Sequence, residues 1–93
     1  MNKFHYVYIL FSLKDKKLYT GYSDNLKNRV TDHLKGNVRA TKGRRPLILI
    51  HYEAFTNLKD AKTREKFLKS GFGRNQLKKA LQNKLKELGY KYL

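Results

Sequence analysis

The sequence predicts an α+β fold, in which a three-stranded antiparallel sheet is flanked by helices in the order β-β-α-β-α-α. Two apolar runs rich in β-branched and aromatic residues, at 4–11 and 47–54, predict strands. A shorter run at 18–22 follows the first closely enough to form a hairpin. The remaining apolar residues recur at helical spacing. A chain of 93 residues has room for one core, so residues 1–93 are expected to form a single domain.

The first strand, at residues 4–11, has the continuous apolar character of a strand that is buried on both faces. Polar residues 14–17 form a turn into the second strand at 18–22. Gly21 inside that strand indicates a close backbone approach, a bend or a bulge. The third strand begins at Pro46 and covers residues 47–54.

The first helix is predicted to be capped by Ser23-Asp24, to run to about Lys35 and to end at Gly36. Its buried stripe is expected to consist of three residues at i, i+4 and i+8: Leu26, Val30 and Leu34. Residues 36–45 contain four basic residues and no acid, which predicts a basic loop.

The second helix is expected to start with the cap pair Asn57 and Asp60 and to run to about Lys69. Residues 70–73 (Ser-Gly-Phe-Gly) are expected to break the chain before a Lys-rich third helix. The apolar face of the third helix is predicted to comprise Leu77, Ala80, Leu81, Leu85 and Leu88.

Charge indicates the class of partner. The chain has 22 Lys and Arg against 7 Asp and Glu, a formal charge of +15, and such an excess is most often balanced by nucleic acid. The absence of Cys excludes disulfides and thiolate metal sites. No apolar run approaches the roughly 20 residues of a membrane span, and the N-terminus does not resemble a signal peptide. We therefore expect a cytoplasmic protein with no membrane partner.

Glu65 is the most informative acidic residue. It lies i+4 from Ala61 and i−3 from Leu68, on the predicted apolar stripe of the second helix. A buried carboxylate needs a cation, because an unpaired buried charge costs several kcal/mol. The cation is a metal, an Arg or a Lys. An ion pair at the core edge, or a rim position, would explain Glu65 without any function.

Arg29 and His33 form an i, i+4 pair on one side of the first helix. The planar guanidinium of Arg suits a phosphate group, and His can donate to a phosphate or transfer a proton. The alternative is a solvated basic edge.

Four tyrosines, Tyr6, Tyr8, Tyr19 and Tyr22, lie on the two hairpin strands. Each one taken alone suits a core aromatic residue with its hydroxyl bonded at the edge. Beside an Arg and a metal, however, a Tyr hydroxyl can take a proton from water, because nearby cations favour the phenolate.

These residues together resemble the GIY-YIG nuclease family. Tyr6-Val7-Tyr8 and Tyr19-Thr20-Gly21 resemble the two-part signature, although Tyr6-Val7 and Thr20 depart from it, and Arg29, His33 and Glu65 follow in the family's order. The resemblance covers residues 4–72 and is closest to the small, stand-alone members related to the excinuclease nuclease domain.

The resemblance implies hydrolysis of DNA phosphodiester bonds with one Mg²⁺ or Mn²⁺ ion. By position, Glu65 would hold the metal, Tyr19 would act as general base or position the attacking water, and Arg29 would bind the scissile phosphate. Tyr8 and His33 would orient water and phosphate.

The expected partner is DNA, including branched or damaged forms, with specificity from DNA shape or from a protein partner. Five basic residues are candidates for nucleic-acid binding: Lys27, Arg39, Lys42, Arg44 and Arg45. Asn75 is the nearest match to a late Asn that family members often carry near the site. The alternative function is a non-catalytic basic nucleic-acid-binding module.

Overall fold

The computed structural model describes residues 3–91 and confirms the predicted α+β class. Three strands form an antiparallel sheet in the order β2-β1-β3. The elements in chain order are β1 (His5–Ser12), β2 (Leu18–Ser23), α1 (Leu26–Lys35), α2 (Arg39–Lys42), β3 (Leu47–Phe55), α3 (Leu58–Lys69), α4 (Gly71–Ala80) and α5 (Gln82–Glu87). No helix in this described range is long and apolar enough to cross a membrane.

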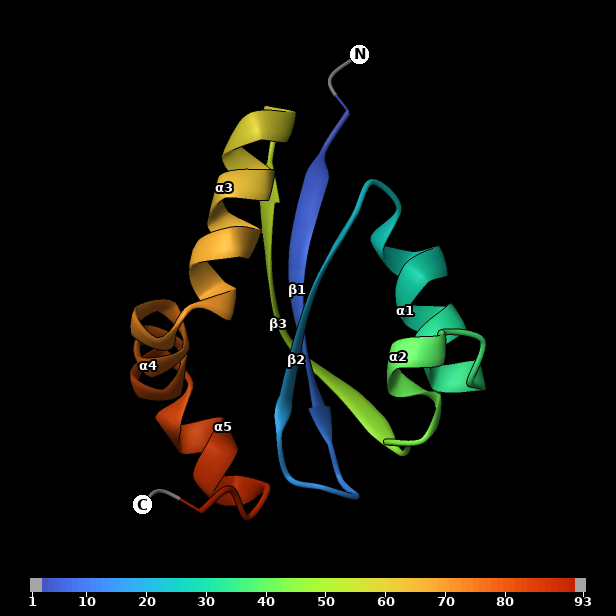
Figure 1. The fold of residues 1–93 in the computed structure, drawn as a ribbon, viewed down its shortest axis with the longest axis vertical. Helices are drawn as coiled ribbons and strands as arrows, with labels where there is room; N and C mark the ends of the chain where they lie inside the picture. The colour runs from blue at the N-terminus through green and yellow to red at the C-terminus, as the bar shows by residue number, and fades with distance from the viewer. Residues whose placement is uncertain (1–2, 92–93) are drawn as a thin grey trace.

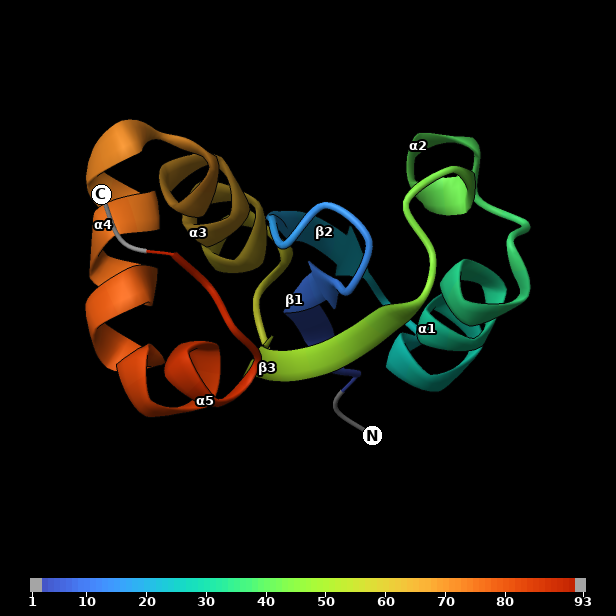
Figure 2. The same cartoon turned by 90° about the horizontal axis from the view of Figure 1, so that it is seen from below.

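The sheet lies between two helical layers. Helices α1 and α2 cover one face, and α3, α4 and α5 lie on the other (Figures 1 and 2). Strand β1 is central, and its side chains alternate between the two layers. Val7 and Ile9 pack with α3 and α4, whereas Tyr8 and Leu10 pack on the α1 side. The prediction of a first strand buried on both faces is thus confirmed.

Helix α1 differs from its prediction at its start and on its buried face. Its N-cap is Asn25, whose side chain accepts a hydrogen bond from the Asn28 backbone, and not Ser23-Asp24. Leu34 is 49% exposed, and His33 is buried in its place. At 100° per residue, position 34 is turned about 80° from Leu26, while position 33 is turned only about 20° from it.

The helix ends as predicted at Gly36, whose φ of 82° is in the left-handed region that glycine adopts readily. The following segment was predicted to be a loop throughout. Its residues 39–42 instead form the short helix α2, and Thr41 of this helix is fully buried.

Helix α3 begins as predicted, since the Asn57 side chain accepts from the backbone N–H groups of Lys59 and Asp60. Ala61 and Leu68 face the core, whereas Leu58 is 48% exposed.

The predicted break over residues 70–73 is wrong in extent, because only Ser70 separates α3 from α4. Ser70 caps α4 by accepting from the backbone N–H of Gly73. A Cβ atom on Gly73 would overlap the backbone carbonyl of Phe67, so this glycine allows α4 to pack tightly against α3. The predicted third helix is also divided at Leu81 into α4 and α5. Of its predicted apolar face, Leu77 and Leu85 are buried and Ala80 is exposed.

Candidate active site

A buried polar chain lies on the α1 side of the sheet. The Tyr8 hydroxyl of β1 is hydrogen-bonded to Nε2 of His33 at 2.7 Å, and Nδ1 of His33 is hydrogen-bonded to the Thr41 hydroxyl at 2.7 Å. All three residues are at most 1% exposed. The alternative in which His33 belongs to a solvated edge is therefore wrong. Thr41 had no signal in the sequence, because nothing distinguishes it from its neighbours in a basic stretch.

Protonation of His33 is disfavoured in this position. Burial lowers the pKa of His33 to about 4, and the positive charge of Arg29 adds to the decrease. The imidazole is thus neutral at pH 7, with one ring nitrogen donating and the other accepting a hydrogen bond. Both ring nitrogens are engaged, one by Tyr8 and one by Thr41, so His33 holds the Tyr8 hydroxyl in place.

Tyr19 joins this cluster from β2. Its ring centroid is 5.1 Å from that of His33, and the Tyr8 ring is 5.5 Å from His33; both are edge-on contacts. Tyr19 is half-buried, unlike Tyr8. Of the two tyrosines, Tyr19 therefore has the hydroxyl-bearing side chain with access to a ligand.

Gly21 makes room for Tyr8. The two residues face each other across the β1–β2 ladder. A Cβ atom on Gly21 would overlap Cζ and the hydroxyl oxygen of Tyr8. Of the three interpretations of a glycine in this strand, the close approach is therefore the correct one, and the irregularity in the sheet lies between β1 and β3 instead.

Arg29 lies one turn before His33 on α1 and is exposed. Burial raises the pKa of the Tyr8 hydroxyl, and the Arg29 guanidinium acts in the opposite direction. The charges of Tyr19 and Glu65 reinforce the rise. Tyr8 thus keeps its proton at neutral pH.

Glu65 projects from α3, on the opposite helical layer. Its side chain is only 14% exposed, and it is bound by Nζ of Lys62 at 3.3 Å and by Nζ of Lys69 at 3.0 Å. The sequence required a cation for this carboxylate, and the structure supplies two lysines. Arg64, the nearest arginine on the helix, instead pairs with Glu53 at 2.8 Å.

The donor set at Glu65 fits a hard divalent cation. Mg²⁺ prefers oxygen ligands, keeps several waters and is often held by one or two carboxylates together with substrate phosphates. Between residues 3 and 91, no group of three or more His, Cys, Asp or Glu side chains gathers at one point. Glu65 would therefore be a single protein ligand. The two lysine side chains are 55% and 52% exposed, so solvent could accommodate them if a metal took their place.

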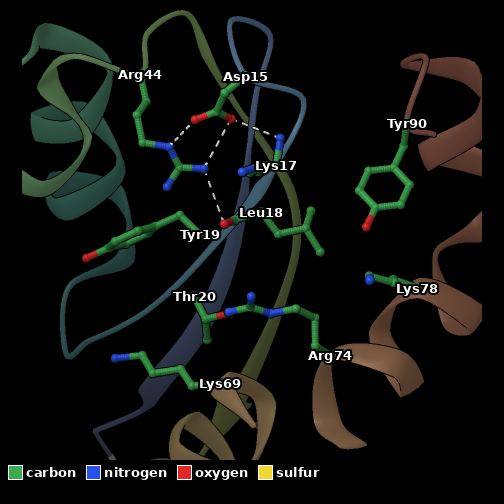
Figure 3. A pocket seen from close by; sticks show the side chains of 10 residues that line it. All are labelled: Asp15, Lys17, Leu18, Tyr19, Thr20, Arg44, Lys69, Arg74, Lys78 and Tyr90. Carbon is green, nitrogen blue, oxygen red and sulfur yellow. Dashed lines mark hydrogen bonds and ion pairs between the residues drawn. The ribbon is translucent and has the colours of Figure 1, made fainter. Parts of the chain in front are cut away.

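An open cavity of about 690 Å³ lies along the edge strand β2, next to the cluster of Tyr8, Tyr19 and His33 (Figure 3). Tyr19 and Thr20 of β2 form part of its wall, and Lys69 and two basic residues of α4 form another part. In Figure 3 the Tyr19 hydroxyl points away from the cavity, toward the side of α1 and α2. Tyr19 thus separates the cavity from the buried polar chain.

The predicted nucleic-acid-binding residues differ in exposure and in the groups that they contact. Lys27, Arg39, Lys42 and Arg45 are exposed. Arg44 is half-buried and holds Asp15 of the hairpin turn, with Nε 2.6 Å from the carboxylate, while its Nη2 donates to the Leu18 carbonyl at 3.3 Å.

Two of the remaining candidates are placed as follows. Nε of Arg45 donates to the Lys42 carbonyl at 3.2 Å. Asn75 is exposed on α4.

Comparison with known proteins gives a consistent match. Residues 4–79 match the family described as the GIY-YIG catalytic domain. A UPF0213 protein of Clostridium perfringens is 40% identical over 88 residues, which cover 92% of each chain. Another, of Haloquadratum walsbyi, is 42% identical over 71 residues, covering 75% of this chain and 79% of that one. The solution NMR structure of a UPF0213 protein from Bacillus halodurans has a TM-score of 0.51 and 36% identity, and the match covers 80% of this chain and 81% of the other.

Proposed function

The chain belongs to the GIY-YIG nuclease family, and from this premise we propose that it is a metal-dependent endonuclease that hydrolyses DNA phosphodiester bonds. One observation carries the proposal: Tyr8 and Tyr19 both contact His33, and the pKa of the Tyr8 hydroxyl is lowered by Arg29 and raised by Glu65. These residues come from four different elements, so their convergence is a property of the fold.

Each residue has a distinct role in this proposal. Glu65 holds one Mg²⁺ or Mn²⁺ ion, which supplies Lewis-acid stabilisation of the charge that develops on the phosphate. Arg29 binds the scissile phosphate with its planar guanidinium. Tyr19 accepts the proton of the attacking water, or positions that water, while the bond from phosphorus to the leaving oxygen breaks.

Tyr8 and His33 support this chemistry without exchanging a proton. Tyr8 retains its hydroxyl proton because burial raises its pKa. His33 is neutral and fixes the orientation of the Tyr8 hydroxyl through the 2.7 Å hydrogen bond. Thr41 in turn fixes the ring of His33, so we assign His33 and Thr41 as positioning residues.

The experiment is cleavage of supercoiled, branched and single-stranded DNA by the purified protein with Mg²⁺ or Mn²⁺. Wild-type protein should cut at least one substrate, and EDTA should stop the reaction. Arg29→Ala should abolish cleavage, while Lys59→Ala, an equal loss of charge on an exposed residue of α3, should leave most of it. Tyr19→Phe should lower the rate with little loss of binding.

The alternative function is a non-catalytic module that binds nucleic acid, and the charge of +15 is the observation that favours it. The cleavage experiment distinguishes the two functions. Such a module binds DNA with the same salt dependence and cuts none of the substrates. Cleavage that survives Arg29→Ala would contradict the assignment of the site, and the absence of metal-dependent cleavage would favour the binding module.

A further inference from the structure

The cavity beside β2 is strongly basic. Five cationic side chains line it: Lys17, Arg44, Lys69, Arg74 and Lys78. One carboxylate faces them, that of Asp15, and it is engaged by Arg44. The Arg44 guanidinium lowers the pKa of Asp15 to about 2, so this ion pair persists at neutral pH. Lys69 is bound to Glu65, which lies outside the lining, so the lining itself carries five cationic side chains against one carboxylate, a balance that suits a polyanion.

The cavity also has apolar and aromatic walls. Leu18 and Tyr90 line it, and Nζ of Lys78 lies 5.6 Å from the centre of the Tyr90 ring. This contact holds the Lys78 ammonium at the cavity. Figure 3 shows Arg74 extending from α4 across the cavity toward Thr20.

The cavity borders the candidate active site at two residues, although the Tyr19 hydroxyl itself points toward α1 and α2. Tyr19, the proposed base, lines it, and so does Lys69, which is bound to Glu65 at 3.0 Å. A strand whose scissile phosphate lies near Tyr19 and Arg29 thus has a basic path along the β2 edge toward α4.

We propose that this cavity is a groove for the phosphodiester backbone of a nucleic-acid strand, in which Arg74 and Lys78 of α4 bind phosphates beyond the scissile one. The proposal rests on the proposed function only for the position of the scissile phosphate. Arg74 and Lys78 are one helical turn apart, about 6 Å, a spacing that suits neighbouring phosphates of one strand. Arg supplies a two-pronged contact and Lys a compact charge.

This assignment moves the main nucleic-acid contact away from the predicted segment 39–45. Arg44 of that segment is committed to Asp15, and Nε of Arg45 to the Lys42 carbonyl. Arg39 and Lys42 are exposed on α2, outside the cavity lining. Binding through Arg39 and Lys42 is therefore the alternative against which the groove is tested.

The test measures binding by fluorescence anisotropy of labelled single-stranded and duplex DNA, and of RNA of the same sequence, in EDTA over a salt series. The double variant Arg74→Ala/Lys78→Gln should bind about tenfold more weakly than the wild type. The slope of log affinity against log salt should fall by about 1.8 on duplex DNA and about 1.4 on single strands, for two lost phosphate contacts. The charge-conserving Arg74→Lys/Lys78→Arg should retain most of the slope.

The matched control is Lys59→Ala/Lys86→Gln, which removes the same charge from two exposed residues outside the cavity. It should change affinity and slope much less. Equal losses in the two double variants would overturn the groove, because net charge alone would then explain them. The loss should appear with both DNA and RNA, since phosphates are common to them; a loss with only one of the two would also contradict a phosphate groove.

A second measurement needs no variant. On adding oligonucleotide to ¹⁵N-labelled wild-type protein in EDTA, the largest amide shifts should cluster at Thr20, Arg74 and Lys78. Shifts centred on residues 38–45 would overturn the proposal.

Because binding is measured in EDTA, where no metal-dependent cleavage occurs, the groove and the nuclease function are tested separately. Binding through the groove by a protein that never cuts DNA would overturn the nuclease function alone. Cleavage that is unchanged in Arg74→Ala/Lys78→Gln, with unchanged salt slope, would overturn the groove alone.

Discussion

The Tyr8 hydroxyl and Nε2 of His33 are hydrogen-bonded at 2.7 Å, with both residues at most 1% exposed. Because both side chains are shielded from solvent, water cannot take the place of either hydrogen-bond partner if that partner is removed. Since His33 is also bonded to Thr41, the pair ties β1 to both α1 and α2. The bond therefore connects the stability of the fold with the geometry of the candidate site, and each connection can be tested.

Removing the Tyr8 hydroxyl should lower the free energy of unfolding by more than the loss of an exposed hydroxyl does. Tyr8→Phe leaves a buried ring nitrogen of His33 without a partner, which should lower the free energy of unfolding by about 1–3 kcal/mol. Urea denaturation measures this change. Tyr52→Phe is the matched control, because Tyr52 pairs with Tyr8 across the sheet but is 52% exposed, and it should change stability by less than about 0.5 kcal/mol. Equal losses in the two variants would contradict the importance of the buried bond.

Adding one methyl group at Gly21 should displace the Tyr8 ring. The new Cβ would overlap Cζ and the hydroxyl oxygen of Tyr8, so Gly21→Ala should cost about 1–3 kcal/mol and weaken cleavage. Gly43→Ala is the control, since a Cβ there meets nothing within 4 Å and its φ is −82°. It should be neutral or slightly stabilising. Thermal unfolding of the two variants decides the point, and equal melting temperatures would contradict the close approach.

Acidification should destabilise the protein through His33. The folded pKa is about 4, below the ordinary value of 6.5, so the unfolded chain binds more protons between these two pH values. His33 contributes no difference above about pH 6.5. As the pH falls to about 4, its contribution should lower stability by about 3 kcal/mol.

Two measurements check this pH dependence. NMR titration of the His33 ring should give a midpoint near 4, and urea midpoints should fall between pH 6.5 and 4. Asp15 cannot produce this change, because its folded pKa of about 2 and its ordinary value of 3.8 both lie below the window. A His33 midpoint near 6.5 would contradict a buried neutral imidazole.

Arg44 should act as a structural residue. Arg44→Lys loses the two-pronged contact with Asp15 and the bond to the Leu18 carbonyl. Because the pair is about one-third exposed, the expected loss of unfolding free energy is about 1 kcal/mol or less. The charge is conserved, so DNA affinity should stay near the wild-type value. A large loss of affinity with full stability would instead indicate a direct phosphate contact.

The sequence was most informative where local patterns decide the structure. The apolar run of β1, the hairpin, the Asn57 cap and the end of α1 at Gly36 follow from residue types and spacing within a few positions. The same holds for Glu65, whose place on the apolar stripe predicted a buried carboxylate with a cation.

Features that depend on tertiary contacts could not be predicted. His33 replaces Leu34 on the buried face because it finds Tyr8 and Thr41, which come from distant parts of the chain. Gly73 suggests a break in the chain, but it lies inside a helix, where its missing side chain accommodates the Phe67 carbonyl. Nothing in the sequence distinguishes Arg44 from its basic neighbours, because its partner Asp15 comes from a distant part of the chain.

The proposed function depends on Glu65 holding the metal for DNA cleavage, and a Mg²⁺ titration of plasmid cleavage tests this role most directly. Glu65→Gln keeps the size of the side chain and removes its charge, whereas Glu87→Gln makes the same change at a side chain on α5 that is 67% exposed. We predict that the wild type and Glu87→Gln cleave with the same Mg²⁺ dependence, and that Glu65→Gln shows no cleavage at any Mg²⁺ concentration while still binding DNA. Cleavage by Glu65→Gln with the wild-type Mg²⁺ dependence would contradict the account.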